Sequence, residues 1–319
     1  MKNKERSQDQ GVVRSRGVAT TVLMVATFMD LMDSTITNVA LPTIGKNLGA
    51  TPEQLEWTVA GYVIAFATLL ITGGGLGDIF GHRRIFVIGI VGFTLASLGA
   101  ALSQTGDLLV AARVLQGGFA GIMMPQVLSS VQVMFAPEER APVLGIIGSL
   151  SALGAVGGLI LGGWLVTADL LGMGWRSIFL VNVPIGVVLV VAALLFVPRS
   201  RSEHPLRPDL VGVLLGGVGV FLVVFPLTDG RAAGWAWWIW AMLTMSPFVI
   251  VAFVWQQGRM LKAHKAPLLP LPLFHDRGFA SGQLVQVATA GTCSSCCITF
   301  RAHSVSLHWQ RGSRFCLSH

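Results

Sequence analysis

Long apolar runs separated by short polar segments fill most of the chain. Eight of these runs are long enough to cross the roughly 30 Å of hydrocarbon in a bilayer, because a spanning helix needs about 20 apolar residues. They cover residues 18–42, 57–77, 85–104, 107–128, 142–166, 177–197, 210–228 and 236–256. A ninth run starts near Phe279 and loses its apolar character after Gly291. The pattern predicts an all-α membrane protein.

The composition agrees with this prediction. Hydrophobic residues make up 53% of the 319 residues and charged residues 12%, about half the charged share of a soluble domain. These figures exclude a disordered chain, a disulfide scaffold and an ordinary cytosolic enzyme. The first run is not a signal peptide, because it is longer than a signal core and contains Asp30 and Asp33.

The net charge of +7 is explained by membrane orientation and not by a nucleic-acid partner. If the N-terminus is cytoplasmic, fourteen Lys and Arg residues fall in the inside segments, and the outside loops hold only Lys46, Arg176 and Arg231. Lys and Arg concentrate on the cytoplasmic side of membrane proteins. We therefore expect a multi-pass protein of the plasma or inner cell membrane, with the lipid bilayer as a partner and no nucleic acid.

Three ionisable residues stand out inside the predicted spans: Asp30, Asp33 and Arg113. On a helix Asp30, Asp33, Ser34 and Thr37 share one stripe, which must face protein or water. At a rise of about 1.5 Å per residue, Asp33 lies about 12 Å and Arg113 about 9 Å from the outer ends of their spans. Their depths match, so we expect the two side chains to pair across a shared cavity.

Two interpretations of this pair stay open. The pair either locks two helices together and has no further role, or it contains a carboxylate whose protonation depends on its partner. A carboxylate of the second kind can load a proton on one side of the membrane and release it on the other, which couples a proton gradient to solute movement. Asp30 is either a second titratable acid or a tolerated polar residue.

Residues 74–84, with the sequence GGLGDIFGHRR, follow the second run and resemble the signature between helices two and three of the major facilitator superfamily. Glycines permit tight helix contact and a sharp turn in this segment. His82 stands where the family usually has a basic residue. The resemblance implies a cytoplasmic latch against the other half of a transporter, formed by Gly74, Gly77, Asp78, Gly81, Arg83 and Arg84.

Three further segments carry the resemblance. Residues 109–117, LVAARVLQG, look like the fourth-helix motif, whose arginine the family uses in proton coupling. Residues 31–42, LMDSTITNVALP, and residues 175–186, WRSIFLVNVPIG, look like the first and sixth helices of fourteen-helix drug:proton antiporters. With the polar stripe of the first span, these motifs give a candidate proton-coupling and substrate cavity of Asp30, Asp33, Ser34, Thr37, Arg113 and Gln116.

The fifth run contains an altered form of the antiporter motif. Gly154, Gly158, Gly162 and Gly163 provide small residues for close packing. In the family a proline follows the glycine that corresponds to Gly158, and here that position holds a leucine. The missing proline removes an expected kink, which weakens the inference to antiport.

The resemblance divides the chain into five segments. We expect a cytoplasmic tail in 1–17, an N-terminal six-helix half in 18–197, a cytoplasmic linker with two additional helices in 198–256, and a cytoplasmic loop with the start of a ninth helix in 257–291. Residues 292–319 are rich in Cys, His and Arg without metal-ligand spacing. We interpret this last segment as out-of-frame translation or a truncation scar and not as native structure.

The function implied by the resemblance is proton-coupled export of amphipathic or cationic drugs, which would confer antibiotic resistance. The expected partners are a small-molecule substrate and protons; no enzyme activity, metal, ATP or cofactor beyond the proton gradient is expected. Alternating access rocks one half of a transporter against the other, so a chain with one half is expected to be inactive. The alternatives are a non-transporting membrane remnant or assembly partner, and a uniporter or importer of the same superfamily.

Overall fold

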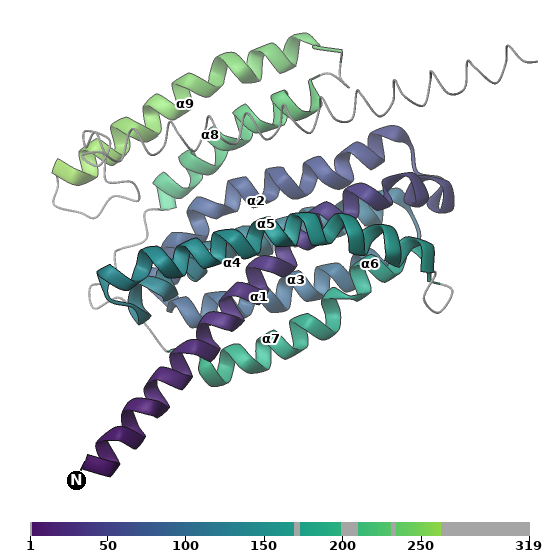
Figure 1. Cartoon of the computed structure of the whole chain (residues 1–319). Helices are drawn as coiled ribbons and strands as arrows, with labels where there is room; N and C mark the ends of the chain where they lie inside the picture. Colours follow the sequence, from purple (N-terminus) through teal and green to yellow (C-terminus); the bar gives the residue numbers. More distant parts are fainter. Residues whose placement is uncertain (1, 169–172, 199–209, 231–233, 263–319) are drawn as a thin grey trace, which may run out of the picture. The chain divides into compact units, whose positions relative to one another are not determined.

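The computed structural model describes residues 2–168, 173–198, 210–230 and 234–262, and every long regular element in this part of the chain is an α-helix (Figure 1). Residues 263–319, with the ninth run and the Cys-rich segment, lie outside the described residues. The helices in chain order are α1 (Lys2–Leu48), α2 (Pro52–Phe80), α3 (His82–Leu102), α4 (Gly106–Met134), α5 (Pro137–Ala168), α6 (Ser177–Leu180) after a 3₁₀ turn (Gly174–Arg176), α7 (Asn182–Phe196), α8 (Leu210–Asp229) and α9 (Trp237–Lys262).

A helix lies at each of the eight predicted runs, which confirms the all-α prediction. Five stretches are long and apolar enough to cross a bilayer, or six if α2, which is bent by 49°, counts as one span. In α5 and α8 the apolar part is shorter, at Val156–Leu165 and Leu214–Leu227. The sixth run is divided at Val181 into α6 and α7, and the two together with the preceding turn form the spanning stretch Gly174–Phe196.

The start of α2 is fixed by a capping box. The backbone N–H of Gln54 donates to Oγ1 of Thr51 at 3.2 Å, and the Gln54 side chain accepts from the Thr51 backbone at 3.0 Å. Pro52 occupies the first turn, where its missing N–H costs nothing. The Gln54 amide also donates to Oδ1 of Asp107 at 2.8 Å and ties the start of α2 to the start of α4.

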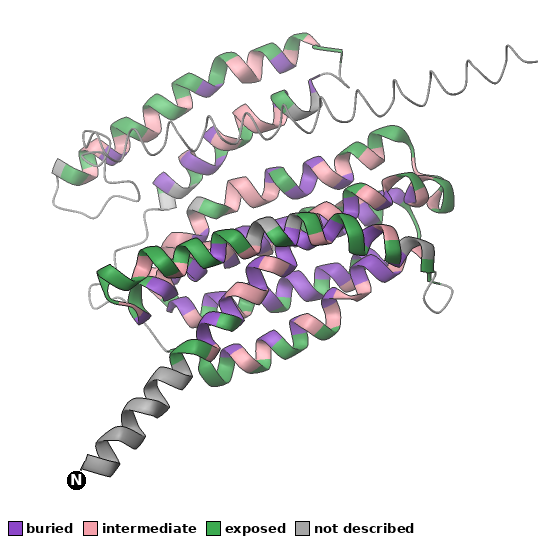
Figure 2. Cartoon of the chain, viewed as in Figure 1, coloured by how far each residue is buried: buried purple, intermediate pink, exposed green. Residues whose placement is uncertain are grey.

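The core forms where α1, α3, α4 and α7 meet. The main helix contacts are α2 with α4, α3 with α4, α1 with α5 and α3 with α7, while α8 packs on α2 and α9. Figure 2 shows many buried residues on α3 and α4 and few on α9. Large apolar side chains such as Leu95 and Ile160 are exposed on the outer faces, which is the pattern expected of a protein that lipid surrounds.

Candidate functional site

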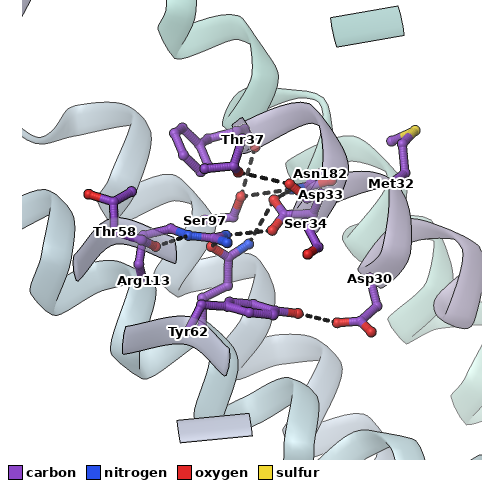
Figure 3. Close-up of polar contacts among 12 residues, drawn as sticks. Asp30, Met32, Asp33, Ser34, Thr37, Thr58, Tyr62, Ser97, Arg113 and Asn182 are labelled. Carbon is purple, nitrogen blue, oxygen red and sulfur yellow. Dashed lines mark hydrogen bonds and ion pairs between the residues drawn. The ribbon is translucent and has the colours of Figure 1, made fainter. Parts of the chain in front are cut away.

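An ion pair between α1 and α4 lies at the centre of the described helices. Nη1 of Arg113 is 2.5 Å from Oδ2 of Asp33, and each of the two side chains is only 1% exposed (Figure 3). The predicted pairing of the two side chains is confirmed. The shared cavity is not, because both side chains are enclosed by protein.

Two amides complete the surroundings of the Asp33 carboxylate. Nε2 of Gln116 donates to Oδ1 of Asp33 at 3.0 Å, and Nδ2 of Asn182 donates to the same oxygen at 2.6 Å. Gln116 also accepts from Nη1 of Arg113 at 2.8 Å. The buried carboxylate therefore has one charged and two neutral donors, which offset the cost of removing its charge from water. These donors come from α4 and α7, so protonation of Asp33 alters contacts between three helices.

The Arg113 guanidinium extends this network to α2. Its Nε donates to the backbone oxygen of Thr58 at 3.2 Å. Its Cζ lies 4.2 Å from the ring centroid of Tyr62 and 5.8 Å from that of Phe179. Such contacts with aromatic faces stabilise a buried cation.

Asn182 joins the network to α3. Its Nδ2 also donates to Oγ of Ser97 at 3.0 Å, and that hydroxyl donates to the backbone oxygen of Phe179 at 2.9 Å. Oδ1 of Asn182 is buried without a hydrogen-bond partner among the described residues. A buried acceptor without a donor is costly, and the two hydrogen bonds that Nδ2 donates to Asp33 and Ser97 offset part of this cost.

The other candidates on the α1 stripe have different surroundings. Asp30 is 5% exposed and accepts a hydrogen bond from the Tyr62 hydroxyl (Figure 3). The Thr37 hydroxyl is buried, and it donates to the backbone oxygen of Asp33 at 2.8 Å, so its hydrogen bond stays within its own helix. Ser34 is half-buried. The structure thus brings Asp33, Arg113 and Gln116 together, places Asp30 in a neighbouring contact, and leaves Thr37 and Ser34 out of the ion-pair network.

Four residues of the network were missed as site residues by sequence reasoning: Thr58, Tyr62, Ser97 and Asn182. Tyr62 was marked by its rarity, because it is the single tyrosine in the chain and stands inside an apolar run. Asn182 was marked by being a polar residue near the start of the sixth run. Thr58 acts through its backbone oxygen, and no sequence signal marks such a contact.

The segment with the latch candidates contains a buried histidine, His82, where α2 ends and α3 begins. His82 is 6% exposed, with Nδ1 2.9 Å from Oε1 of Gln126 and Nε2 3.5 Å from Oδ1 of Asp78. The Gln126 amide nitrogen donates to the backbone oxygens of Gly73 at 2.6 Å and Ile122 at 3.1 Å. Its oxygen must therefore accept, which places a hydrogen on Nδ1 of His82.

The glycines of this segment have distinct roles. A Cβ on Gly77 would lie 2.0 Å from Oε1 of Gln126, so only glycine leaves room for that amide. Gly81 has φ 95°, a conformation that favours glycine at the turn. The nearest atom to a Cβ on Gly74 would be 4.0 Å away, so this position is not tightly packed.

The two arginines of the segment differ in their contacts. Nη1 of Arg83 donates to the backbone oxygen of Val197 at 3.4 Å, whereas Arg84 is exposed. Across the described residues no group of three or more His, Cys, Asp or Glu side chains is arranged to hold a metal ion.

Three of the four fifth-helix candidates pack against α1. A Cβ on Gly154 would lie 3.1 Å from the Phe28 ring, and a Cβ on Gly162 would lie 3.3 Å from Cα of Ile36. A Cβ on Gly158 would lie 1.8 Å from Oγ1 of Thr35. Gly163 differs, because a Cβ there would meet nothing within 4 Å. The small-residue face predicted for α5 therefore contains the first three glycines and excludes Gly163.

This difference predicts contrasting effects of alanine on α5. Gly158→Ala should lower the free energy of unfolding by about 1–3 kcal/mol, because the new methyl overpacks the contact with α1. Gly163→Ala should be neutral or stabilise by up to about 1 kcal/mol, because alanine is the better helix former. Denaturant unfolding in detergent micelles, followed by circular dichroism, measures both values. Equal effects of the two variants would contradict this packing.

Comparisons with known proteins agree with the helical bundle and its motifs. The model of the Major Facilitator Superfamily matches residues 23–210. The probable actinorhodin transporter of Streptomyces coelicolor is 43% identical over 272 residues, which cover 85% of this chain and 47% of that protein. The tetracenomycin C resistance and export protein of Streptomyces glaucescens is 34% identical over 276 residues, covering 86% and 49%. The chain spans about half the length of these relatives.

Solved transporters show the same fold at low sequence identity. The human organic anion transporter MFSD10 has a TM-score of 0.51 at 14% identity, covering 68% of this chain and 56% of its own. The proton:xylose symporter XylE has a TM-score of 0.50 at 16% identity, covering 70% and 55%. The helical fold agrees with these structures, and the family match extends over more than half of the sequence. The chain belongs to the Major Facilitator Superfamily.

Proposed function

We propose that these residues form the N-terminal half and the linker helices of a fourteen-helix drug:proton antiporter, which exports amphipathic or cationic compounds across the cell membrane. The observation that carries the proposal is the buried Asp33–Arg113 pair, in which one carboxylate contacts donors from α4 and α7. The printed names of relatives support export: one is an actinorhodin transporter and another a tetracenomycin C resistance and export protein.

The Asp33–Arg113 pair is suited to proton coupling, because protonation of Asp33 removes the attraction between the two charges. A proton on Asp33 cancels the negative charge that faces Arg113, which leaves the guanidinium with the Thr58 oxygen, Gln116 and the Tyr62 ring. An uncompensated buried charge is costly. Protonation of Asp33 therefore favours a rearrangement of the helices that carry these groups. Both side chains are enclosed in this structure, so a cationic substrate reaches Asp33 only after such a rearrangement, and it then competes with the proton for the same carboxylate.

The proposed topology has a cytoplasmic N-terminus, as the distribution of Lys and Arg predicts. The segment with Asp78, Arg83 and Arg84 then lies on the cytoplasmic side, where it serves as the latch against the second half. In the fourteen-helix arrangement α8 and α9 are the two additional helices between the halves. Their contacts support this assignment, because α8 packs on α2 and α9 and stands apart from α1 and α5 among the main contacts.

Export requires both halves, since alternating access moves one against the other. We expect a polypeptide of residues 1–319 alone to give no export above a vector control. A chimera that joins residues 1–262 to the part of the Streptomyces coelicolor relative that follows the position aligned with Lys262 should export. The assay adds ethidium, a lipophilic cation, to energised everted vesicles and follows both dye uptake and proton release with a pH-sensitive probe.

Asp33→Asn in the chimera is the matched variant, because it keeps the size of the side chain and removes its charge. It should abolish ethidium-induced proton release. Robust export by residues 1–319 alone would contradict the need for a second half. Ethidium movement without proton release would favour a uniporter of the same superfamily, and proton release that survives Asp33→Asn would remove Asp33 from the coupling role.

A further inference from the structure

Asp30 is a second buried carboxyl group that the ion pair does not use. It lies on the same stripe of α1 as Asp33, is 5% exposed, and accepts a hydrogen bond from the Tyr62 hydroxyl of α2. Among the described residues it forms no ion pair. Figure 3 shows Asp30 beyond the hydroxyl end of the Tyr62 side chain, whose ring face is turned to Arg113.

The two acids differ in how their surroundings compensate charge. Asp33 faces a guanidinium and two amides, so a proton on Asp33 disrupts an established ion pair. Asp30 faces a phenol, which is both a donor and an acceptor. The Tyr62 hydroxyl donates to an ionised Asp30, and a protonated Asp30 can donate to the same hydroxyl oxygen. The contact therefore accommodates both protonation states without movement of the backbone.

Tyr62 contacts both charged sites at once. Its hydroxyl binds Asp30, while its ring face lies 4.2 Å from Cζ of Arg113. A phenol that donates to a carboxylate has a more electron-rich ring, and the attraction between a cation and a ring depends on that negative face. The protonation state of Asp30 thus changes how firmly α2 holds the guanidinium that pairs with Asp33.

We propose that Asp30 and Tyr62 form a second proton-binding site, which communicates with the Asp33–Arg113 pair through the Tyr62 ring. The proposal rests on the proposed function for its role in transport, in which Asp30 is a second carboxyl that exchanges protons. Proton binding by Asp30 itself requires no transport. The charged and titratable groups that face it are Tyr62, Arg113 and Asp33.

Infrared difference spectroscopy tests the proposal on residues 1–319 in liposomes, without substrate. The carbonyl stretch of a protonated carboxyl is recorded as the pH is changed. The wild-type protein should give a band from a buried protonated carboxyl, and Asp30→Asn should remove it. Tyr62→Phe should shift the frequency of the Asp30 band, because the hydrogen bond is lost. Asp107→Asn, at an exposed carboxyl, is the control and should leave this band in place.

The outcomes separate this proposal from the proposed function. A spectrum of Asp30→Asn that superposes on the wild type over the whole titration would overturn the second site. If Asp30→Asn loses its helical circular dichroism, Tyr62→Phe carries the test, and an unmoved carboxyl band in that variant overturns the proposal. A chimera without export, together with an Asp30 band that titrates, would refute the antiporter and leave the proton site standing.

Discussion

Replacing Arg113 with leucine is expected to lower the free energy of unfolding by about 3–5 kcal/mol, because a buried carboxylate is left without its counter-charge. Asp33 is 2% exposed and cannot regain water without separating α1 from α4. The variant also loses the hydrogen bond to the Thr58 oxygen and the contact with the Tyr62 ring. Unfolding of the purified chain in micelles by added denaturing detergent, followed by circular dichroism, measures the loss.

A double-mutant cycle gives the energy of the pair itself. Asp33→Asn alone leaves a buried guanidinium, and the double variant Asp33→Asn/Arg113→Leu removes both charges. The double variant should be less destabilised than the sum of the two single variants, since no unpaired charge remains. Strict additivity would show that the two side chains do not interact energetically, despite the 2.5 Å contact.

Gly117→Ala is expected to destabilise the protein by about 3 kcal/mol, the upper end of overpacking costs. A Cβ on Gly117 would lie 2.2 Å from the backbone oxygen of Tyr62 and 2.8 Å from its Cα. Backbone atoms cannot rotate away as a side chain does, so α2 as a whole must move from α4. The displacement would also pull the Tyr62 ring from Arg113.

Gly148→Ala on α5 is the control for this variant, because a Cβ there would meet nothing within 4 Å. It should be neutral or stabilise by up to about 1 kcal/mol through helix propensity. The same detergent unfolding series measures both variants. A loss of similar size in Gly148→Ala would attribute the effect to glycine replacement in general and not to the contact between α2 and α4.

Hydropathy located every described long helix but not its ends. The first run was placed at 18–42, whereas α1 covers Lys2–Leu48. The run around 57–77 extends to Pro52–Phe80, because the capping box and Gly81 set the ends of α2 and neither depends on apolar side chains. Apolar content marks where a helix meets lipid or core, and hydrogen bonding decides where it begins and ends.

The ion pair was predictable because depth in a membrane helix is a one-dimensional quantity. The rise per residue placed Asp33 and Arg113 at matching heights, and few buried charges compete for partners. The contacts of Tyr62 and Asn182 were not predictable, because they depend on the rotation of α2 and α7 about their axes. The sequence also does not distinguish Gly158, where a Cβ would meet Thr35, from Gly163, where a Cβ would meet nothing within 4 Å. Both glycines lie in the same glycine-rich stretch.

Contacts join α2 and α4 along the whole length of their interface. Gln54 binds Asp107 where both helices start, Gly117 meets the Tyr62 backbone midway, and Gln126 donates to the oxygen of Gly73 toward the opposite end. Movement of one of these helices against the other would have to break all three contacts in the same step. We therefore expect α2 and α4 to move together, with α1 shifting against them at the Asp33–Arg113 contact.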